Sequence, residues 1–135
     1  MNNNGFILFS TIILLNFFLL LFNLLSESTL IQNKLATDQL YRTKVHYHAL
    51  SAIPFIPENL DLLTTFTQPI TKENIYNNTT FNLNINLESK LYLTKTDDAI
   101  YCSAILNNNA RTIIKFNYSF TEAGYSINDW EKFND

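Results

Sequence analysis

The sequence predicts an α+β protein with a single transmembrane helix at its N-terminus, and three observations support this. Residues 5–25 contain neither a charged residue nor proline. Apolar residues then recur at helical spacing until Pro54, and from residue 81 apolar and polar residues alternate as in a half-buried β-strand. We expect a membrane anchor over residues 1–27. Residues 28–135 should form a small domain in which a juxtamembrane helix precedes an antiparallel sheet of four or five strands.

The apolar run is long enough to cross a bilayer. Its 21 residues would span about 31 Å as a helix, which matches the thickness of a hydrocarbon core. A secretory signal has a basic start and a shorter apolar core, whereas this chain starts with Met1 and three asparagines. Ser26-Glu27-Ser28 could serve as a cleavage site, so removal of the segment is the alternative. We expect the segment to be retained.

Two amides interrupt the apolar run, Asn16 and Asn23. Seven residues are close to two helical turns, so both side chains share one face of the helix. A buried amide hydrogen bond is worth roughly 1 kcal/mol in a membrane, which favours a face that contacts another helix. The alternative is codon bias, because six residue types favoured by AT-rich codons (Phe, Tyr, Met, Ile, Asn and Lys) supply 59 of 135 positions.

Composition argues against several classes of function. A net charge of −3 without a basic stripe argues against a nucleic-acid partner. The only cysteine, Cys102, cannot form an intramolecular disulfide and is expected to be a small buried side chain. With two glycines in the chain, no Gly-rich phosphate loop is available. We expect no catalytic site, no metal and no cofactor.

The two histidines, His46 and His48, are the strongest candidates for a metal site. On a strand their rings would share a face and could bind a metal together with Cys102, whereas on a helix they diverge by about 200°. The segment that contains them fits either structure, and we predict a helix. The alternative is a small membrane-tethered enzyme or metal protein.

The first predicted helix runs out of the membrane as far as Pro54, although Ser28 could instead start a separate helix. Proline and an acidic residue in the segment 57–60 predict a second, short helix that ends before Pro69. The juxtamembrane helix should present an apolar stripe formed by Ile31, Leu35, Leu40, Tyr41, Val45, Ala49, Leu50 and Ile53.

The predicted strands occupy residues 81–87, 91–95, 99–106 and 111–120. Asp97 and Asp98 lie in a predicted turn, and residues 107–110 in a predicted four-residue hairpin loop. Residues 128–135 are predicted to be a polar tail. In the last strand we expect Ile114, Phe116, Tyr118 and Phe120 to share one face. One helix laid over the apolar face of the sheet would supply the core.

Three short stretches follow one another after the anchor: Tyr47-His48-Ala49-Leu50, Pro57-Glu58-Asn59-Leu60, and Pro69-Ile70, which is expected to open the small antiparallel sheet. In this arrangement the chain resembles the mitochondrial cytochrome oxidase assembly factor family, whose relatives include a small subunit of the presequence translocase. The resemblance covers about residues 45–106. The family's Leu-Gly before Pro-Ile is represented here by Leu62-Leu63 at a longer spacing. The resemblance implies a single-pass inner-membrane protein that binds respiratory-chain subunits and is not an enzyme.

Two arguments about topology disagree. Lys34, Arg42 and Lys44 follow the anchor within 20 residues, so the positive-inside rule places the domain in the cytoplasm or matrix. The resemblance implies the intermembrane space. The side of the membrane that the domain faces therefore stays open.

We thus expect a non-enzymatic accessory or assembly subunit of a mitochondrial inner-membrane respiratory-chain complex, with a role in electron transport. Its partners would be other subunits and the lipid bilayer, and Tyr125 and Trp130 are candidate contacts as exposed aromatic residues. The alternative is a secretory-pathway or surface protein with a β-rich binding domain. Three glycosylation sequons, at Asn77, Asn78 and Asn117, are as many as chance predicts and do not decide between them.

Overall fold

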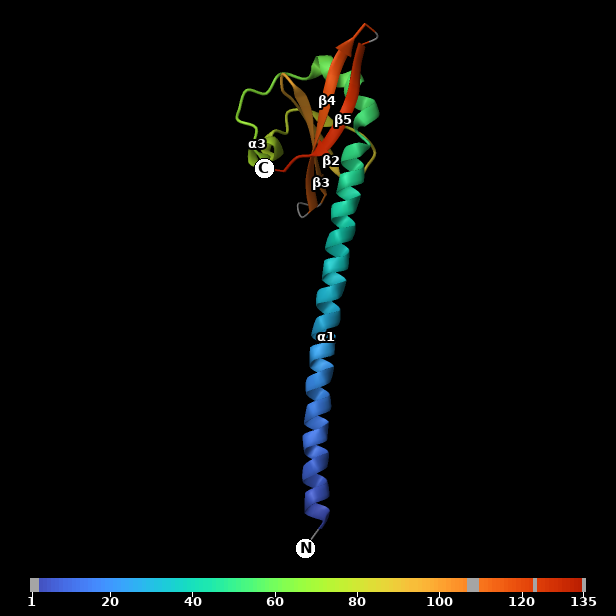
Figure 1. The fold of residues 1–135 in the computed structure, drawn as a ribbon, viewed down its shortest axis with the longest axis vertical. Coiled ribbons are helices and arrows are strands. Elements are labelled where there is room, and N and C mark those ends of the chain that lie inside the picture. Colours follow the sequence, from blue (N-terminus) through green and yellow to red (C-terminus); the bar gives the residue numbers. More distant parts are fainter. Residues whose placement is uncertain (1–2, 107–109, 123, 135) are drawn as a thin grey trace. The chain divides into compact units, whose positions relative to one another are not determined.

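A computed structural model of the chain describes residues 3–106, 110–122 and 124–134. The chain divides into two compact units, residues 1–38 and 39–135. Helix α1, Asn3–Leu50, is one uninterrupted helix and contributes to both units (Figure 1). The prediction of a helix that continues past the membrane segment is confirmed, and the alternative of a separate helix starting at Ser28 is wrong. The predicted anchor boundary at residue 27 refers to the bilayer and stays a prediction.

The first unit is helical from Asn3 and its apolar side chains are exposed. Among the described residues, one helix is long and apolar enough to cross a membrane, and it lies near the N-terminus. Hydroxyl groups in this helix donate to carbonyl oxygens one turn earlier, Ser10 to Phe6 at 2.5 Å and Thr29 to Leu25 at 2.8 Å. Such bonds satisfy polar side chains where no water is present.

The second unit contains a five-stranded antiparallel sheet in which sequence neighbours are also spatial neighbours. The predicted α+β class is therefore confirmed. β3 lies in the middle, and seven of its eight side chains are buried because both of its faces are covered. The strands are β1 (Asn82–Leu83), β2 (Lys90–Lys95), β3 (Ala99–Leu106), β4 (Ala110–Thr121) and β5 (Gly124–Lys132).

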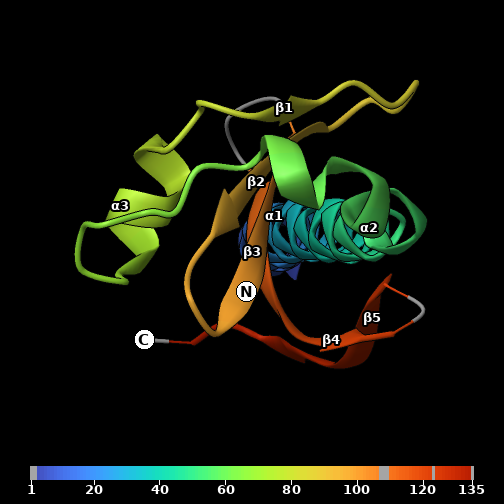
Figure 2. The same ribbon diagram turned by 90° about the horizontal axis from the view of Figure 1, so that it is seen from above.

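The last turns of α1 cover one face of the sheet and supply most of the core (Figure 2). Val45 and Ala49 of α1 are fully buried against Cys102, Ile114 and Phe116 of the strands. The stripe predicted for this helix is buried only at its C-terminal end. The side chains of its upstream part, Ile31, Leu35, Leu40 and Tyr41, are exposed.

After α1, the chain forms three short helical segments, η1 (Ile53–Phe55), α2 (Ile56–Asn59) and η2 (Leu60–Leu62). Pro54 lacks the N–H that would continue α1, so the chain turns there into the 3-10 segment η1. The short second helix predicted around Pro57 is confirmed, with Ile56 as its first residue. Ile56 and Leu60 are buried in the same core as the end of α1.

A further helix, α3 (Lys72–Asn77), lies on the opposite face of the sheet and was not predicted (Figure 2). Its Ile75 packs with Ala99, Tyr101 and Ile113 in a second, smaller core. The Thr71 side chain accepts a hydrogen bond from the Asn74 N–H at 3.2 Å, which caps the helix. Thr71 before the acidic Glu73 is the signal in the sequence that could have located α3.

The prediction of a strand over residues 81–87 is wrong beyond Leu83, because the ladder with β2 contains only Asn82 and Leu83. The Ile85 N–H donates to the Leu83 carbonyl at 2.9 Å and the Leu87 N–H to the Ile85 carbonyl at 2.7 Å. Bonds of this kind between residues two apart form γ-turns. Successive γ-turns repeat every two residues and reproduce the alternation of a strand without pairing.

The prediction of a polar tail over residues 128–135 is also wrong, since most of it belongs to β5. The strand pairs with β4 over its whole length, including Trp130 opposite Phe116. Its sequence is polar because it lies at the sheet edge and is largely exposed. The predicted hairpin loop at 107–110 falls mostly on residues 107–109, which lie outside the described residues, and Ala110 begins β4.

Candidate functional site

The membrane segment of α1 carries the two predicted contact residues, Asn16 and Asn23. Both side chains are exposed in the helix. Their spacing of seven residues corresponds to about 10.5 Å along the helix axis, so the two amides lie on one face, two turns apart. An amide in hydrocarbon requires hydrogen-bond partners, and a second helix on this face would supply them.

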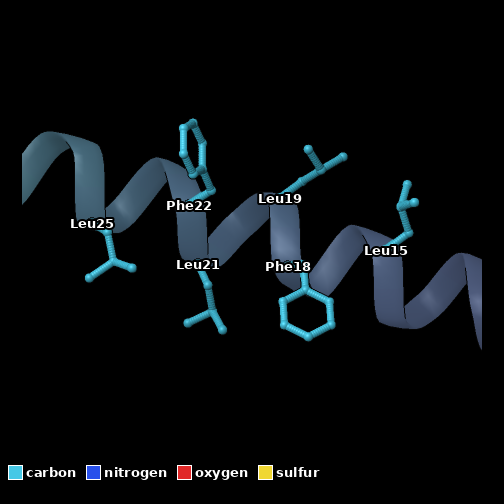
Figure 3. Close-up of a pocket in the computed structure, with 6 residues that line it drawn as sticks. All are labelled: Leu15, Phe18, Leu19, Leu21, Phe22 and Leu25. Atoms are coloured by element: carbon cyan, nitrogen blue, oxygen red, sulfur yellow. The ribbon is translucent and has the colours of Figure 1, made fainter.

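Large leucine and phenylalanine side chains surround the middle of the same helix and are exposed. Figure 3 shows Leu15, Leu19 and Phe22 on one side of the helix and Phe18, Leu21 and Leu25 on the other. The helix thus presents apolar side chains on both of these sides, where lipid chains or the side chains of a neighbouring helix can pack.

The domain carries the other two predicted contact residues on β5. Trp130 is 43% exposed, and its ring centre lies 5.6 Å from that of His46 on α1. Because Trp130 pairs with the buried Phe116, it projects from the face that α1 covers. Its outer part remains available for a partner.

The expectation that Tyr125 is exposed is wrong, since the residue is half-buried and packs against the main core. Its ring lies 6.0 Å from that of Tyr118 and 5.1 Å from that of Phe120. Phe120 is 73% exposed and is the aromatic surface residue that sequence reasoning missed. The ladder shifts register between Asn117 and Tyr118, and Phe120 lies beyond that shift near the end of the hairpin, where α1 no longer covers the sheet.

β5 is also an edge strand, which pairs with β4 on one side only within the described sheet. A strand edge presents backbone N–H and C=O groups to which a partner strand can add. The opposite edge, β1, is only two residues long. The β4–β5 hairpin thus carries two exposed aromatic residues, Trp130 and Phe120, and the edge of the sheet.

The candidate catalytic and metal-binding residues do not come together. His46 and His48 lie on α1, as predicted, where His46 packs on Trp130 and His48 Nδ1 lies 2.7 Å from Ser89 Oγ. Among the described residues no three His, Cys, Asp or Glu side chains are grouped to hold a metal. Asp97 and Asp98 lie in the predicted turn between β2 and β3.

Cys102 is fully buried in the main core, as predicted. Burial raises the pKa of its thiol to about 12, because the surroundings disfavour the thiolate. Nucleophilic and metal-binding chemistry both need the thiolate. The structure therefore gives Cys102 a packing role.

No family model matches this chain, and neither a curated protein nor a solved structure is significantly similar to it. The resemblance to the assembly factor family stays a prediction from sequence.

Proposed function

We propose that this protein is a non-enzymatic, single-pass accessory or assembly subunit of a mitochondrial inner-membrane respiratory-chain complex. The observation that carries the proposal is the exposed apolar surface of α1 between Gly5 and Leu25. This surface needs lipid or protein around it, and its two amides favour protein on one face. The helix continues without a break into the domain.

The features of the domain support binding rather than catalysis. The Cys102 thiol is buried in the core, and the His48 ring forms a hydrogen bond with Ser89. The exposed aromatics of the domain and its free strand edge instead provide a docking surface on β4 and β5. A small anchored domain with such a surface suits an accessory subunit.

The mitochondrial assignment is supported by the AT-rich coding signature and by the first two motifs of the resemblance. In the fold, Tyr47–Leu50 ends α1, and Pro57–Leu60 lies in α2 and at the start of η2. Pro69 and Ile70 precede α3 rather than the sheet, which begins at Asn82. The order of the first two motifs thus fits an anchor followed by a juxtamembrane helix.

The test is blue-native electrophoresis of gently solubilised membranes, with mass spectrometry of the band that contains this chain. Co-migration with respiratory-complex subunits at high mass would support the proposal and name the complex. Migration as a free monomer in several mild detergents would contradict it.

A pair of variants tests the role of the amide face. Asn16→Leu with Asn23→Leu should keep the chain in the membrane but release it from the high-mass band, because the interhelical hydrogen bonds are lost. Leu14→Ala with Leu21→Ala is the matched control, since these residues have the same spacing and lie about 200° around the helix. Equal behaviour of the two double variants would argue against a contact through the asparagines.

The secretory alternative can be tested on the same samples. Asn77 is exposed, whereas the Asn78 side chain donates to Thr94 Oγ1 at 2.9 Å and Thr94 is buried. Glycan attachment is therefore expected at Asn77 if the domain enters the secretory pathway. A shift to lower mass after glycosidase treatment would favour this alternative, because mitochondrial proteins do not receive N-glycans.

A further inference from the structure

A polar pocket of about 350 Å³ lies in the second unit where α1 meets β4 and β5. Its volume is in the lower part of the range of about 300–1,000 Å³ that is typical of small-molecule sites. Three cationic residues line it, Arg42, Arg111 and Lys132, together with the polar residues Thr43, His46 and Thr112. None of the described residues that line it is acidic.

The sheet register places Lys132 on the side of the sheet that carries this pocket. Lys132 pairs with Ile114, whose side chain is in the core under α1, so Lys132 also projects on the α1 face. The neighbouring Glu131 projects on the other face, where its Oε1 lies 2.7 Å from Lys115 Nζ. The nearest carboxylate in sequence is therefore directed away and paired, in a chain of net charge −3.

Neither Arg42 nor Lys132 forms a salt bridge with any residue in the described part of the chain. The third cation, Arg111, contributes less, because its guanidinium lies on the opposite face of the sheet, 5.7 Å from the centre of the Tyr76 ring of α3. Two cations, Arg42 and Lys132, are thus available to a ligand.

Thr112 supplies a buried hydroxyl donor to this pocket. It is 5% exposed, and its Oγ1 has no hydrogen-bond partner among the described residues. Leaving such a group unsatisfied is unfavourable, because burial removes its hydrogen bonds to water. Thr112 pairs with Ala104 of the main core, so it also projects on the α1 face. Ser103 Oγ is likewise buried without a partner, but Ser103 does not line this pocket.

We propose that this pocket binds a phosphate group, with Arg42 and Lys132 as charged donors and the Thr112 hydroxyl as a neutral donor. The donors come from three different elements, α1, β5 and β4. Donors that converge from three directions suit the tetrahedral oxygens of phosphate better than a planar carboxylate. The phosphate belongs either to a soluble molecule or to a phospholipid headgroup. The proposal does not depend on the respiratory-chain role.

The chain contains its own reporter for this site. Trp130 is its only tryptophan, and its ring contacts the pocket residue His46 at a centre distance of 5.6 Å. Occupation of the pocket should therefore change tryptophan fluorescence. The first arm titrates the full-length protein in an uncharged detergent with inorganic phosphate, against sodium chloride of equal ionic strength. The second arm compares phosphatidylcholine vesicles with and without phosphatidic acid.

Three variants make the test specific. Arg42→Gln with Lys132→Gln should weaken the response by about tenfold or more, because two charged hydrogen bonds are lost. Lys44→Gln is the matched control, since it removes a cation from the same helix that is paired with Glu88 at 2.5 Å. Thr112→Val keeps the side-chain shape and should weaken the response without lowering the unfolding temperature.

A saturable response to inorganic phosphate that is retained in Lys44→Gln and weakened in the double variant supports the site and assigns a soluble phosphate. A response confined to vesicles with phosphatidic acid, with the same dependence on the variants, supports the site and assigns a lipid headgroup. The proposal is overturned by no response in either arm, or by an equal response in all variants.

Discussion

Phe116 and Phe120 are the same residue type on one strand, and their environments are opposite. Phe116 is fully buried in the main core, whereas Phe120 is 73% exposed. We expect Phe116→Ala to lower the free energy of unfolding by about 3–5 kcal/mol through lost burial and a cavity. Phe120→Ala should change it by no more than about 0.5 kcal/mol. Chemical unfolding followed by circular dichroism in mild detergent measures both, and similar losses would place Phe116 outside the core.

The environment of Cys102 predicts a thiol that is inert in the folded protein. With a pKa of about 12, the thiolate fraction at pH 8 is only about one in ten thousand. Iodoacetamide should therefore leave Cys102 unmodified in the native protein and modify it fully in denaturant, as read by intact mass. Prompt modification of the native protein would contradict the burial.

The same pKa shift has a consequence for stability in alkaline solution. The unfolded chain releases the thiol proton near its ordinary pKa of 9.0, and the folded chain only near 12. Above pH 9 the folded state thus binds more protons than the unfolded state, so stability falls as the pH rises from 9 towards 12. Cys102→Ala should reduce this decline relative to the parent protein.

At the scale of single elements, α3 depends on its cap. The helix has six residues, and one side-chain oxygen, that of Thr71, accepts from its first turn. Thr71→Ala should cost about 1 kcal/mol, because the Asn74 N–H loses its partner and α3 holds Ile75 in the second core. Thr71→Ser keeps the oxygen and serves as the control. Unfolding midpoints compare the two, and an unchanged midpoint in Thr71→Ala would show that the cap adds nothing.

The elements also show which parts of the fold could be predicted from sequence. The long helix, β2, β3 and β4 follow from periodicity, because each has one or two faces buried along most of its length. Residues 84–87 misled the prediction because γ-turns share the period of a strand. β5 was missed because an exposed edge strand needs few apolar residues and is held by backbone pairing with β4, which a period in the sequence does not reveal.

The candidate sites also differ in whether they can be recognised from the sequence. The spacing of Asn16 and Asn23 can be recognised in sequence because both lie on one continuous helix. Arg42, Thr112 and Lys132 are far apart in the chain, and only the α1 packing and the register of β4 with β5 bring them to one pocket. Sequence reasoning used Arg42 for topology and assigned no role to the other two.

At the scale of the whole molecule, the two units differ in whether their apolar side chains are buried or exposed. Both core clusters are built from residues between 39 and 135, and the first begins at Val45. The large apolar side chains of the first unit are exposed and form no core of their own. Folding of the domain and insertion into the bilayer thus draw on different residues.

This separation predicts that a chain restricted to residues 39–135 folds alone. It should unfold in a single cooperative transition, because its core is complete, and it should partition into the aqueous phase of a detergent phase separation. The full-length chain should partition into the detergent phase, because its exposed apolar helix requires a hydrophobic environment. Phe116→Ala within residues 39–135 is the control that should lower the transition temperature. An aggregated fragment without a cooperative transition would show that residues 1–38 stabilise the domain, and the two units would then have to be treated as one folding unit.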